Sequence, residues 1–111
     1  MVKHLDATLA ALADPQRRSV VDALRAGPRR AGELAEECGT SAPVMSRHLR
    51  RLRECGLVEC ALVDEDARVR VYRLRAAPLA ELRGWLEEVE AFWAAQLESF
   101  GRHVQRKARK K

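Results

Sequence analysis

The chain has 111 residues and a formal net charge of +5, from 21 basic and 16 acidic residues. Six of the basic residues lie from Arg102 onward without any acid, which leaves 15 basic and 16 acidic residues, a net charge of −1, in the rest of the chain. The overall charge is therefore no sign of nucleic-acid binding, and without a run of 18 apolar residues the sequence excludes a membrane-spanning helix.

The first part of the chain is typical of two short helices. Leu5, Leu9 and Leu12 recur at the spacing of one helical face. Asp14 followed by Pro15 is typical of a helix N-cap and the first helical position after it. We therefore expect one helix before Asp14 and another after it.

Two more helices are expected before Gly56. The run RRAGELAEECG predicts a compact third helix that ends at Gly39. Ser41 can then cap a fourth helix that continues to about Glu54, where Gly56 stops it. Two helices joined by such a tight turn form a helix-turn-helix pair.

Two β-like segments and a long helix complete the chain. The segments GLVECALV and RVRVYRL flank the polar run DEDA, as in a β-hairpin. Beyond the hairpin, apolar residues step by threes and fours along one helical stripe: Leu79, Leu82, Leu86, Val89, Trp93, Leu97, Phe100 and Val104. We predict a mainly α-helical α+β fold, a winged helix-turn-helix with a two-stranded wing and a long C-terminal helix. The folded domain should span residues 1–104, and residues 105–111 should form a disordered basic tail.

The fourth predicted helix is apolar on one side and basic on the other. Met45, Leu49 and Leu52 fall within about 60° of one another on a helical wheel. The opposite side gathers polar and basic residues: Pro43, Ser46, Arg47 and Arg50. A solvated helix face is the alternative interpretation, but the second helix of a helix-turn-helix enters the major groove of DNA. This position favours DNA contact.

Side-chain chemistry suggests how these residues contact DNA. Arg47 and Arg50 can each present two donors to guanine, while Ser41 and Ser46 can bind phosphates or base edges. In the wing, arginines beside the DEDA turn suit phosphates or the minor groove, although the three acids argue against contact by the tip itself. The full predicted set is Ser41, Pro43, Ser46, Arg47, His48, Arg50, Arg51, Arg68 and Arg70.

Three stretches together carry a family resemblance. LADPQRRSVVDAL, AGELAEECGTSAPVMSRHLRRLRECGLVE and RVRVYRL resemble the ArsR/SmtB family of winged-helix transcriptional repressors. The resemblance implies a homodimer that binds a palindromic operator in double-stranded DNA and dimerises through its first and last helices. An apolar stripe too wide for one small domain to cover agrees with that expectation. The predicted interface is Leu5, Leu9, Leu82, Trp85, Leu86, Val89, Phe92, Trp93, Leu97 and Phe100.

Neither metal-ligand set of the family matches this chain. The third helix carries GELAEEC where metal-binding members have a cysteine cluster, and the last helix offers only His103. We therefore expect no metal and no cofactor. His4 and His103 could meet across a dimer and bind zinc together with Asp6, but two surface histidines are the simpler interpretation.

The cysteines and the N-terminus indicate the cellular environment. Cys38, Cys55 and Cys60 include no CxxC pair, so reduced thiols are expected, with a Cys55–Cys60 redox switch as the alternative. Acidic residues near the N-terminus argue against a secretory signal, and the protein is expected to be cytoplasmic.

The sequence thus predicts a transcriptional repressor that binds a palindromic operator through the helix at 41–54 and the wing at 58–74. The alternative is a winged-helix protein-interaction module without sequence-specific DNA binding. The sequence contains no phosphate-binding loop and no nucleophile–base set, so nothing in it indicates an enzyme.

Overall fold

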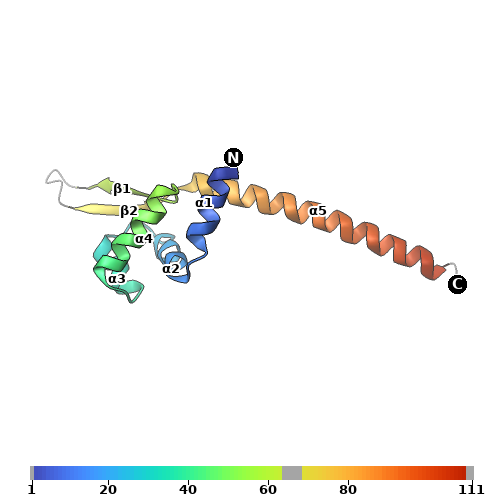
Figure 1. The fold of residues 1–111 in the computed structure, drawn as a ribbon, viewed down its shortest axis with the longest axis horizontal. Helices are drawn as coiled ribbons and strands as arrows, with labels where there is room; N and C mark the ends of the chain where they lie inside the picture. Colours follow the sequence, from blue (N-terminus) through green and yellow to red (C-terminus); the bar gives the residue numbers. More distant parts are fainter. Residues whose placement is uncertain (1, 64–68, 110–111) are drawn as a thin grey trace. The chain divides into compact units, whose positions relative to one another are not determined.

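The computed structural model describes residues 2–63 and 69–109, which contain five helices and one two-stranded sheet. The chain divides into two compact units, Met1–Ala80 and Glu81–Lys111. In order (Figure 1), the elements are α1 (Val2–Leu12), α2 (Pro15–Leu24), α3 (Ala31–Glu37), α4 (Ala42–Glu54), β1 (Val58–Leu62), β2 (Arg70–Leu74) and α5 (Ala76–Arg109). The predicted winged helix-turn-helix fold is confirmed, with α3 and α4 as the helix pair and the β-hairpin as the wing.

Side-chain caps determine where two helices of the first unit begin. The Oδ1 atom of Asp14 accepts hydrogen bonds from the backbone N–H groups of Gln16 (2.8 Å) and Arg17 (3.2 Å). Ser41 caps α4 by accepting a bond from the backbone N–H of Val44 at 3.4 Å. Both predicted N-caps are confirmed, and each satisfies backbone donors that have no partner within the helix.

Glycines end α3 and α4. Gly39 has φ +62° and Gly56 has φ +80°, a left-handed conformation that glycine adopts without steric cost. After Gly39 the chain turns into α4, so the joint of the helix-turn-helix requires this residue. After Gly56 the backbone N–H of Leu57 donates to the carbonyl of Leu52 at 3.0 Å, and the chain enters β1.

The wing hairpin is antiparallel, and its register places Cys60 opposite Tyr72. An additional pairing was not predicted: Arg29, just before α3, forms a β-bridge with Tyr72. The two residues exchange backbone hydrogen bonds of 3.0 and 2.8 Å. This bridge ties the wing to the segment that leads into the helix-turn-helix.

The apolar core of the first unit lies among α2, α3, α4 and the hairpin. In Figure 1 the three helices lie on one side of the hairpin, and α4 contacts β1 while α2 and α3 contact β2. The predicted inner face of α4 is confirmed, because Met45, Leu49 and Leu52 are at most 2% exposed. They pack with residues of neighbouring elements, among them Val20, Leu24, Leu34, Leu57 and Val58.

Helix α5 extends further toward the C-terminus than predicted. It begins at Ala76, with Pro78 in its first turn, where a proline costs no hydrogen bond. It continues to Arg109, so residues 105–109, expected to be disordered, are helical. Among the described residues, no helix is both long enough and apolar enough to cross a membrane.

Candidate nucleic-acid interface

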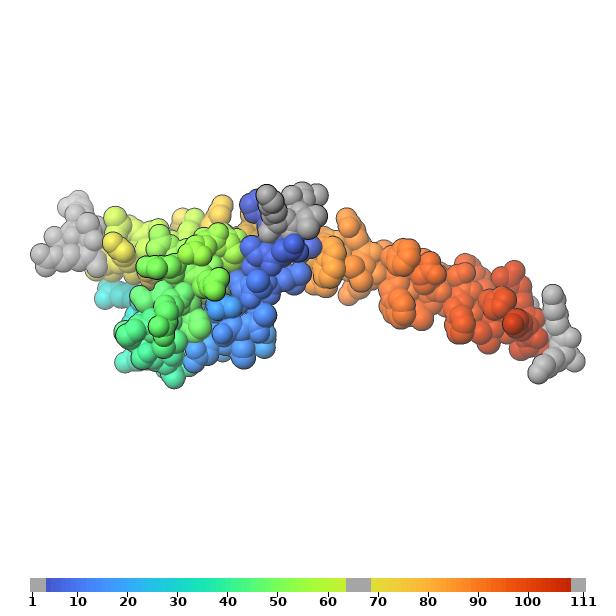
Figure 2. Space-filling model, viewed as in Figure 1, coloured from blue at the N-terminus to red at the C-terminus, as the bar shows by residue number. Residues whose placement is uncertain are grey.

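The outer face of α4 carries the predicted DNA-binding side chains. Ser41, Pro43, Ser46, Arg47 and Arg50 are all exposed. Within the described part of the chain, neither arginine lies within 4.0 Å of a carboxylate or donates a side-chain hydrogen bond. In the view of Figure 2 the green atoms of α4 are open to solvent. The two guanidinium groups therefore keep their donors for an external ligand.

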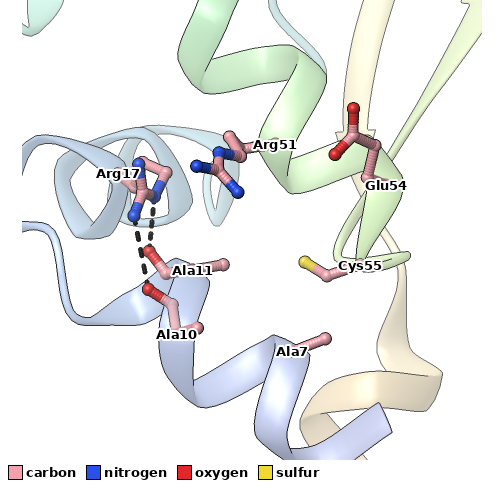
Figure 3. A pocket seen from close by; sticks show the side chains of 7 residues that line it. All are labelled: Ala7, Ala10, Ala11, Arg17, Arg51, Glu54 and Cys55. Carbon is pink, nitrogen blue, oxygen red and sulfur yellow. Dashed lines mark hydrogen bonds between the residues drawn. The ribbon is translucent and has the colours of Figure 1, made fainter. Parts of the chain in front are cut away.

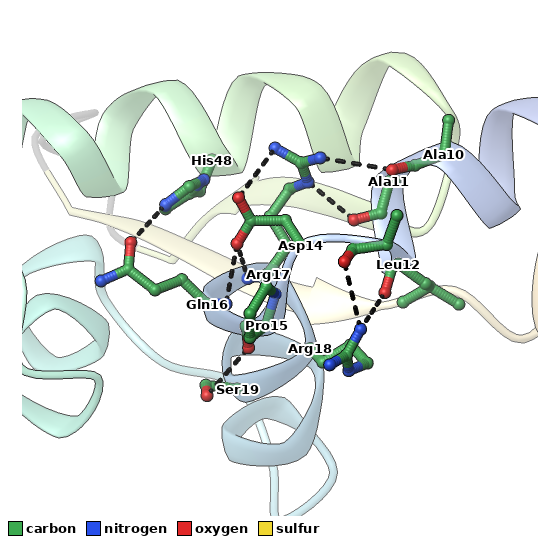
Figure 4. A network of polar contacts seen from close by, with 11 residues as sticks. Ala10, Ala11, Leu12, Asp14, Pro15, Gln16, Arg17, Arg18, Ser19 and His48 are labelled. Atoms are coloured by element: carbon green, nitrogen blue, oxygen red, sulfur yellow. Dashed lines mark hydrogen bonds and ion pairs between the residues drawn. The ribbon is translucent and has the colours of Figure 1, made fainter.

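His48 lies on the flank of α4 that faces α2. Its ring is half-buried, and Nε2 donates to the Oε1 atom of Gln16 at 2.7 Å (Figure 4). An amide oxygen only accepts, so Nε2 must carry the proton. This bond anchors the middle of α4 to the first turn of α2. DNA contact by His48 stays a prediction, and the Gln16 partner was not identified from the sequence.

The N-cap of α2 lies next to this bond. The backbone N–H of Arg17 is the largest cause holding the pKa of Asp14 below its ordinary value of 3.8. Desolvation opposes the shift, whereas the N–H of Gln16 and the charges of Arg17 and His48 reinforce it. The ionised carboxylate is therefore the form that the folded corner stabilises.

Two arginines of α2 close the corner between α1 and α2. The Nε atom of Arg17 donates to the carbonyl of Ala11 at 2.7 Å, and Nη1 of Arg18 donates to the carbonyl of Leu12 at 2.7 Å (Figure 4). Carbonyls in the last turn of a helix have no intrahelical partner, so these bonds act as a C-terminal cap. The sequence alone did not distinguish these structural arginines from DNA-binding ones.

In the wing, Arg70 shares a face of the hairpin with Tyr72. Residues two apart in a strand point to the same side, and Cys60 opposite Tyr72 lies on that side as well. Burial raises the pKa of Tyr72 and the Cys60 thiol raises it further, while the charges of Arg53 and Arg70 lower it. Arg53 of α4 and Arg70 of the wing thus act on the same phenol.

The other face of the hairpin is occupied by ion pairs. Glu59 lies opposite Arg73 in the register and forms ion pairs with Arg73 and Arg75. The exposed Arg70 makes no such pair within the described residues. Arg68, also predicted to contact DNA, lies outside the described residues.

Most of the predicted dimer residues are exposed, whereas Leu82 of α5 is half-buried. In α1, Leu5 is half-buried and Leu9 is exposed. In the second unit, α5 leaves a stripe of large apolar side chains uncovered, with Phe92 67% and Trp93 61% exposed. The stripe also includes Trp85, Leu86, Val89, Leu97, Phe100 and Val104. So much exposed apolar surface on one helix marks an interaction surface.

The histidines and cysteines form no metal centre in the described ranges. No group of three or more His, Cys, Asp or Glu side chains is placed to bind a metal ion there. His4 and His103 are both exposed. All three cysteines are free thiols, and the thiol of Cys55 donates to the carbonyl of Leu52 at 3.3 Å. Cys60 instead lies beside Tyr72, so the two thiols of the predicted redox pair have different neighbours.

Comparison with known proteins agrees with this geometry. A helix-turn-helix domain family matches residues 12–61. The HTH-type transcriptional regulator Rv2034 of Mycobacterium tuberculosis is 37% identical over 100 residues, which cover 89% of this chain and 87% of that protein.

Two solved structures have the same fold. An ArsR-like transcriptional regulator from Rhodococcus sp. RHA1 has a TM-score of 0.76 and 30% identity, covering 89% of this chain and 91% of its own. The transcriptional repressor BigR from Xylella fastidiosa has a TM-score of 0.58 and 33% identity, covering 79% and 84%. This chain therefore belongs to the ArsR family of winged helix-turn-helix transcriptional regulators.

Proposed function

We propose that this regulator is a homodimeric repressor that acts in the cytoplasm and binds a palindromic operator. The observation that carries the proposal is the outer face of α4, where Arg47 and Arg50 are exposed and have no acidic partner among the described residues. A guanidinium group donates two parallel hydrogen bonds to O6 and N7 of guanine. Arg47 and Arg50 are the proposed base contacts.

Residues around these two arginines supply the phosphate contacts. Ser41 and Ser46 are exposed near the N-terminus of α4, whose backbone N–H groups favour a phosphate. Arg70 extends the basic surface onto the wing, on the hairpin face it shares with Tyr72. Such contacts set the register of a protein on DNA and carry little sequence information.

Dimerisation follows from the uncovered apolar stripe of α5 together with Leu9 of α1. In a symmetric dimer that buries these stripes, the two α4 helices would be related by a two-fold axis. The half-sites would then be separated by about 34–36 Å, one turn of DNA, or by a multiple of it. A palindromic operator matches this symmetry.

Repression rather than activation is supported by similar proteins that are named repressors, among them BigR. An operator that overlaps a promoter would exclude RNA polymerase while the dimer is bound. We further propose that the operator lies upstream of the regulator's own gene. A promoter–reporter fusion should then be expressed more strongly when the regulator is deleted, whereas weaker expression would indicate activation.

The base contacts can be tested with Arg47→Ala, Arg50→Ala and the double variant. Each single change should weaken operator binding by about 1–3 kcal/mol and relax the preference for guanine at one position. Arg25→Ala is a matched control, because Arg25 is exposed on the first unit and, among the described residues, forms an ion pair with Asp22 alone. Footprints and binding isotherms on the upstream DNA would measure both effects. Sequence-specific binding that persists in the double variant would contradict the assignment.

A further inference from the structure

A cleft separates the second half of α4 from α1 and α2. It has a volume of about 280 Å³, and Ala7, Ala10, Ala11, Arg17, Arg51, Glu54 and Cys55 line it (Figure 3). All of these residues belong to the first unit. The cleft lies on the flank of α4, beside the exposed face that carries Arg47 and Arg50, and shares Arg51 with the predicted DNA-binding set.

One wall of the cleft is apolar and shallow. Three alanines of α1 form it, and their methyl groups leave unfilled the space that larger side chains would occupy. The Cys55 sulfur points into the same space (Figure 3), and sulfur makes favourable contacts with aromatic edges. This wall suits a flat, uncharged group such as a six-membered ring.

The opposite side of the cleft is cationic. Arg17 is largely held in place, because its Nε and Nη2 atoms donate to the carbonyls of Ala11 (2.7 Å) and Ala10 (3.3 Å). Arg51 is exposed, and among the described residues it has no ion pair and no side-chain hydrogen-bond partner. Its guanidinium group points toward the space between the alanines and Cys55 (Figure 3). A carboxylate placed there would receive two parallel hydrogen bonds from Arg51.

The charges that line the cleft favour a single negative charge on the ligand. Arg17 already pairs with Asp14 at 3.8 Å, so Arg51 is the lining cation that has no acidic partner among the described residues, and a monoanion would neutralise it. A dianion would add repulsion from Glu54. The small volume, near the lower limit for ligand sites, also favours a compact molecule.

We propose that this cleft binds a small organic monocarboxylate with an apolar body, and that the bound ligand lowers the affinity for the operator. The carboxylate pairs with Arg51, and the apolar body lies on the alanines of α1. Arg51 is also one of the residues predicted to contact DNA, so a ligand that neutralises it would compete with that contact. This regulatory effect rests on the proposed operator binding, whereas the ligand site does not.

The cleft and the predicted interface residues of α1 lie on different faces of that helix. Ala7 is two residues from both Leu5 and Leu9, and two residues turn an α-helix by about 200°. The cleft therefore lies on the side of α1 away from the predicted interface residues. Ligand binding and dimerisation use different faces of the same helix, which allows the ligand to act on an intact dimer.

Benzoate is the probe for the site, with benzamide as its uncharged counterpart. Calorimetric titration of the full-length protein should show saturable binding of one benzoate per chain, with benzamide weaker by about tenfold or more. Arg51→Gln should weaken benzoate binding by a similar factor, and Ala7→Leu should abolish it by filling the cleft. Arg53→Gln, a matched change on the other flank of α4, should leave it unchanged.

Both test positions are exposed, and circular dichroism of each variant verifies the fold. Three results would each contradict the ligand site. They are a titration with benzoate that does not saturate, binding of benzamide as tight as that of benzoate, and an equal loss of benzoate affinity in Arg51→Gln and Arg53→Gln. Saturating benzoate should raise the operator dissociation constant of the wild type about tenfold and leave that of Ala7→Leu unchanged. An unaltered wild-type constant would overturn the regulatory effect. A protein that binds benzoate but no specific DNA would contradict only the proposed function.

Discussion

The Nε2 atom of His48 donates a hydrogen bond to Oε1 of Gln16 at 2.7 Å, joining two helices across 32 residues of sequence. This bond is the polar contact between the flank of α4 and the first turn of α2. The apolar residues Met45, Leu49 and Leu52 determine which side of α4 packs into the core. The His48–Gln16 bond opposes rotation and sliding of the helix about that face, so it positions Arg47 and Arg50 as well.

A double-mutant cycle on His48→Ala and Gln16→Ala tests this contact. Because each variant removes one partner, we expect a coupling free energy of about 0.5–1.5 kcal/mol in urea unfolding at one fixed protein concentration. Operator affinity should fall in each single variant and fall little further in the double variant. Strictly additive losses of unfolding free energy would show that the bond makes no contribution.

The N-cap of α2 should make stability dependent on acidity. The pKa of Asp14 is lowered in the folded protein, mainly because its carboxylate accepts a hydrogen bond from the backbone N–H of Arg17. The ionised carboxylate therefore stabilises the folded protein fully above pH 3.8, the ordinary pKa, and this stabilisation is lost as the pH falls through the lower pKa of the folded state. Asp14→Asn keeps a capping oxygen but removes the charge. The unfolding midpoint of this variant should therefore fall less steeply than that of the wild type below about pH 4.

Thermal unfolding midpoints between pH 2.5 and 7 measure this effect. Asp22→Asn is the control, because the Asp22 side chain is exposed and, among the described residues, its carboxylate accepts no hydrogen bond from a backbone N–H. If Asp14→Asn and Asp22→Asn change the acid limb equally, the cap is not its source.

The apolar stripe of α5 should control the oligomeric state. Val89 and Trp93 lie near the middle of the stripe and are 45% and 61% exposed. Changing both to Ser should dissociate the dimer, since buried aromatic contacts at the centre of an interface contribute about 2 kcal/mol or more each. Ala91→Ser is the control, because Ala91 is two residues from both Val89 and Trp93 and two residues turn an α-helix by about 200°. Sedimentation equilibrium distinguishes the two states, and a double variant that remains dimeric would refute the interface.

The two faces of the wing should differ in their salt dependence. Arg70→Ala should reduce the slope of log K against log salt concentration by about 1, because one phosphate contact is lost. Arg73→Ala should leave the slope unchanged, since Arg73 lies on the other face and pairs with Glu59. Operator titrations from 50 to 300 mM salt measure both slopes. Equal slopes for the two variants would contradict the proposed contact between Arg70 and a DNA phosphate.

The arrangement of α4 was predictable because it depends on local periodicity. An α-helix repeats every 3.6 residues, so the spacing of Met45, Leu49 and Leu52 alone determined which side is buried and placed Arg47 and Arg50 outside. The caps at Asp14 and Ser41 were predictable for the same reason, because a cap acts on backbone groups two or three residues away.

Only the tertiary structure decided the roles of residues on the flanks. His48 and Arg51 lie between the buried and exposed faces of α4, where the helical period does not predict a role. The packing of α1 and α2 against α4 places Gln16 within hydrogen-bond distance of His48, and it places Arg51 in the lining of the cleft. The bridge from Arg29 to Tyr72 was unpredictable as well, since a single pair of residues far apart in sequence carries no periodic signal. Local spacing thus determined the helices and their faces. Contacts between distant segments, which depend on how the core packs, decided what the intermediate side chains do.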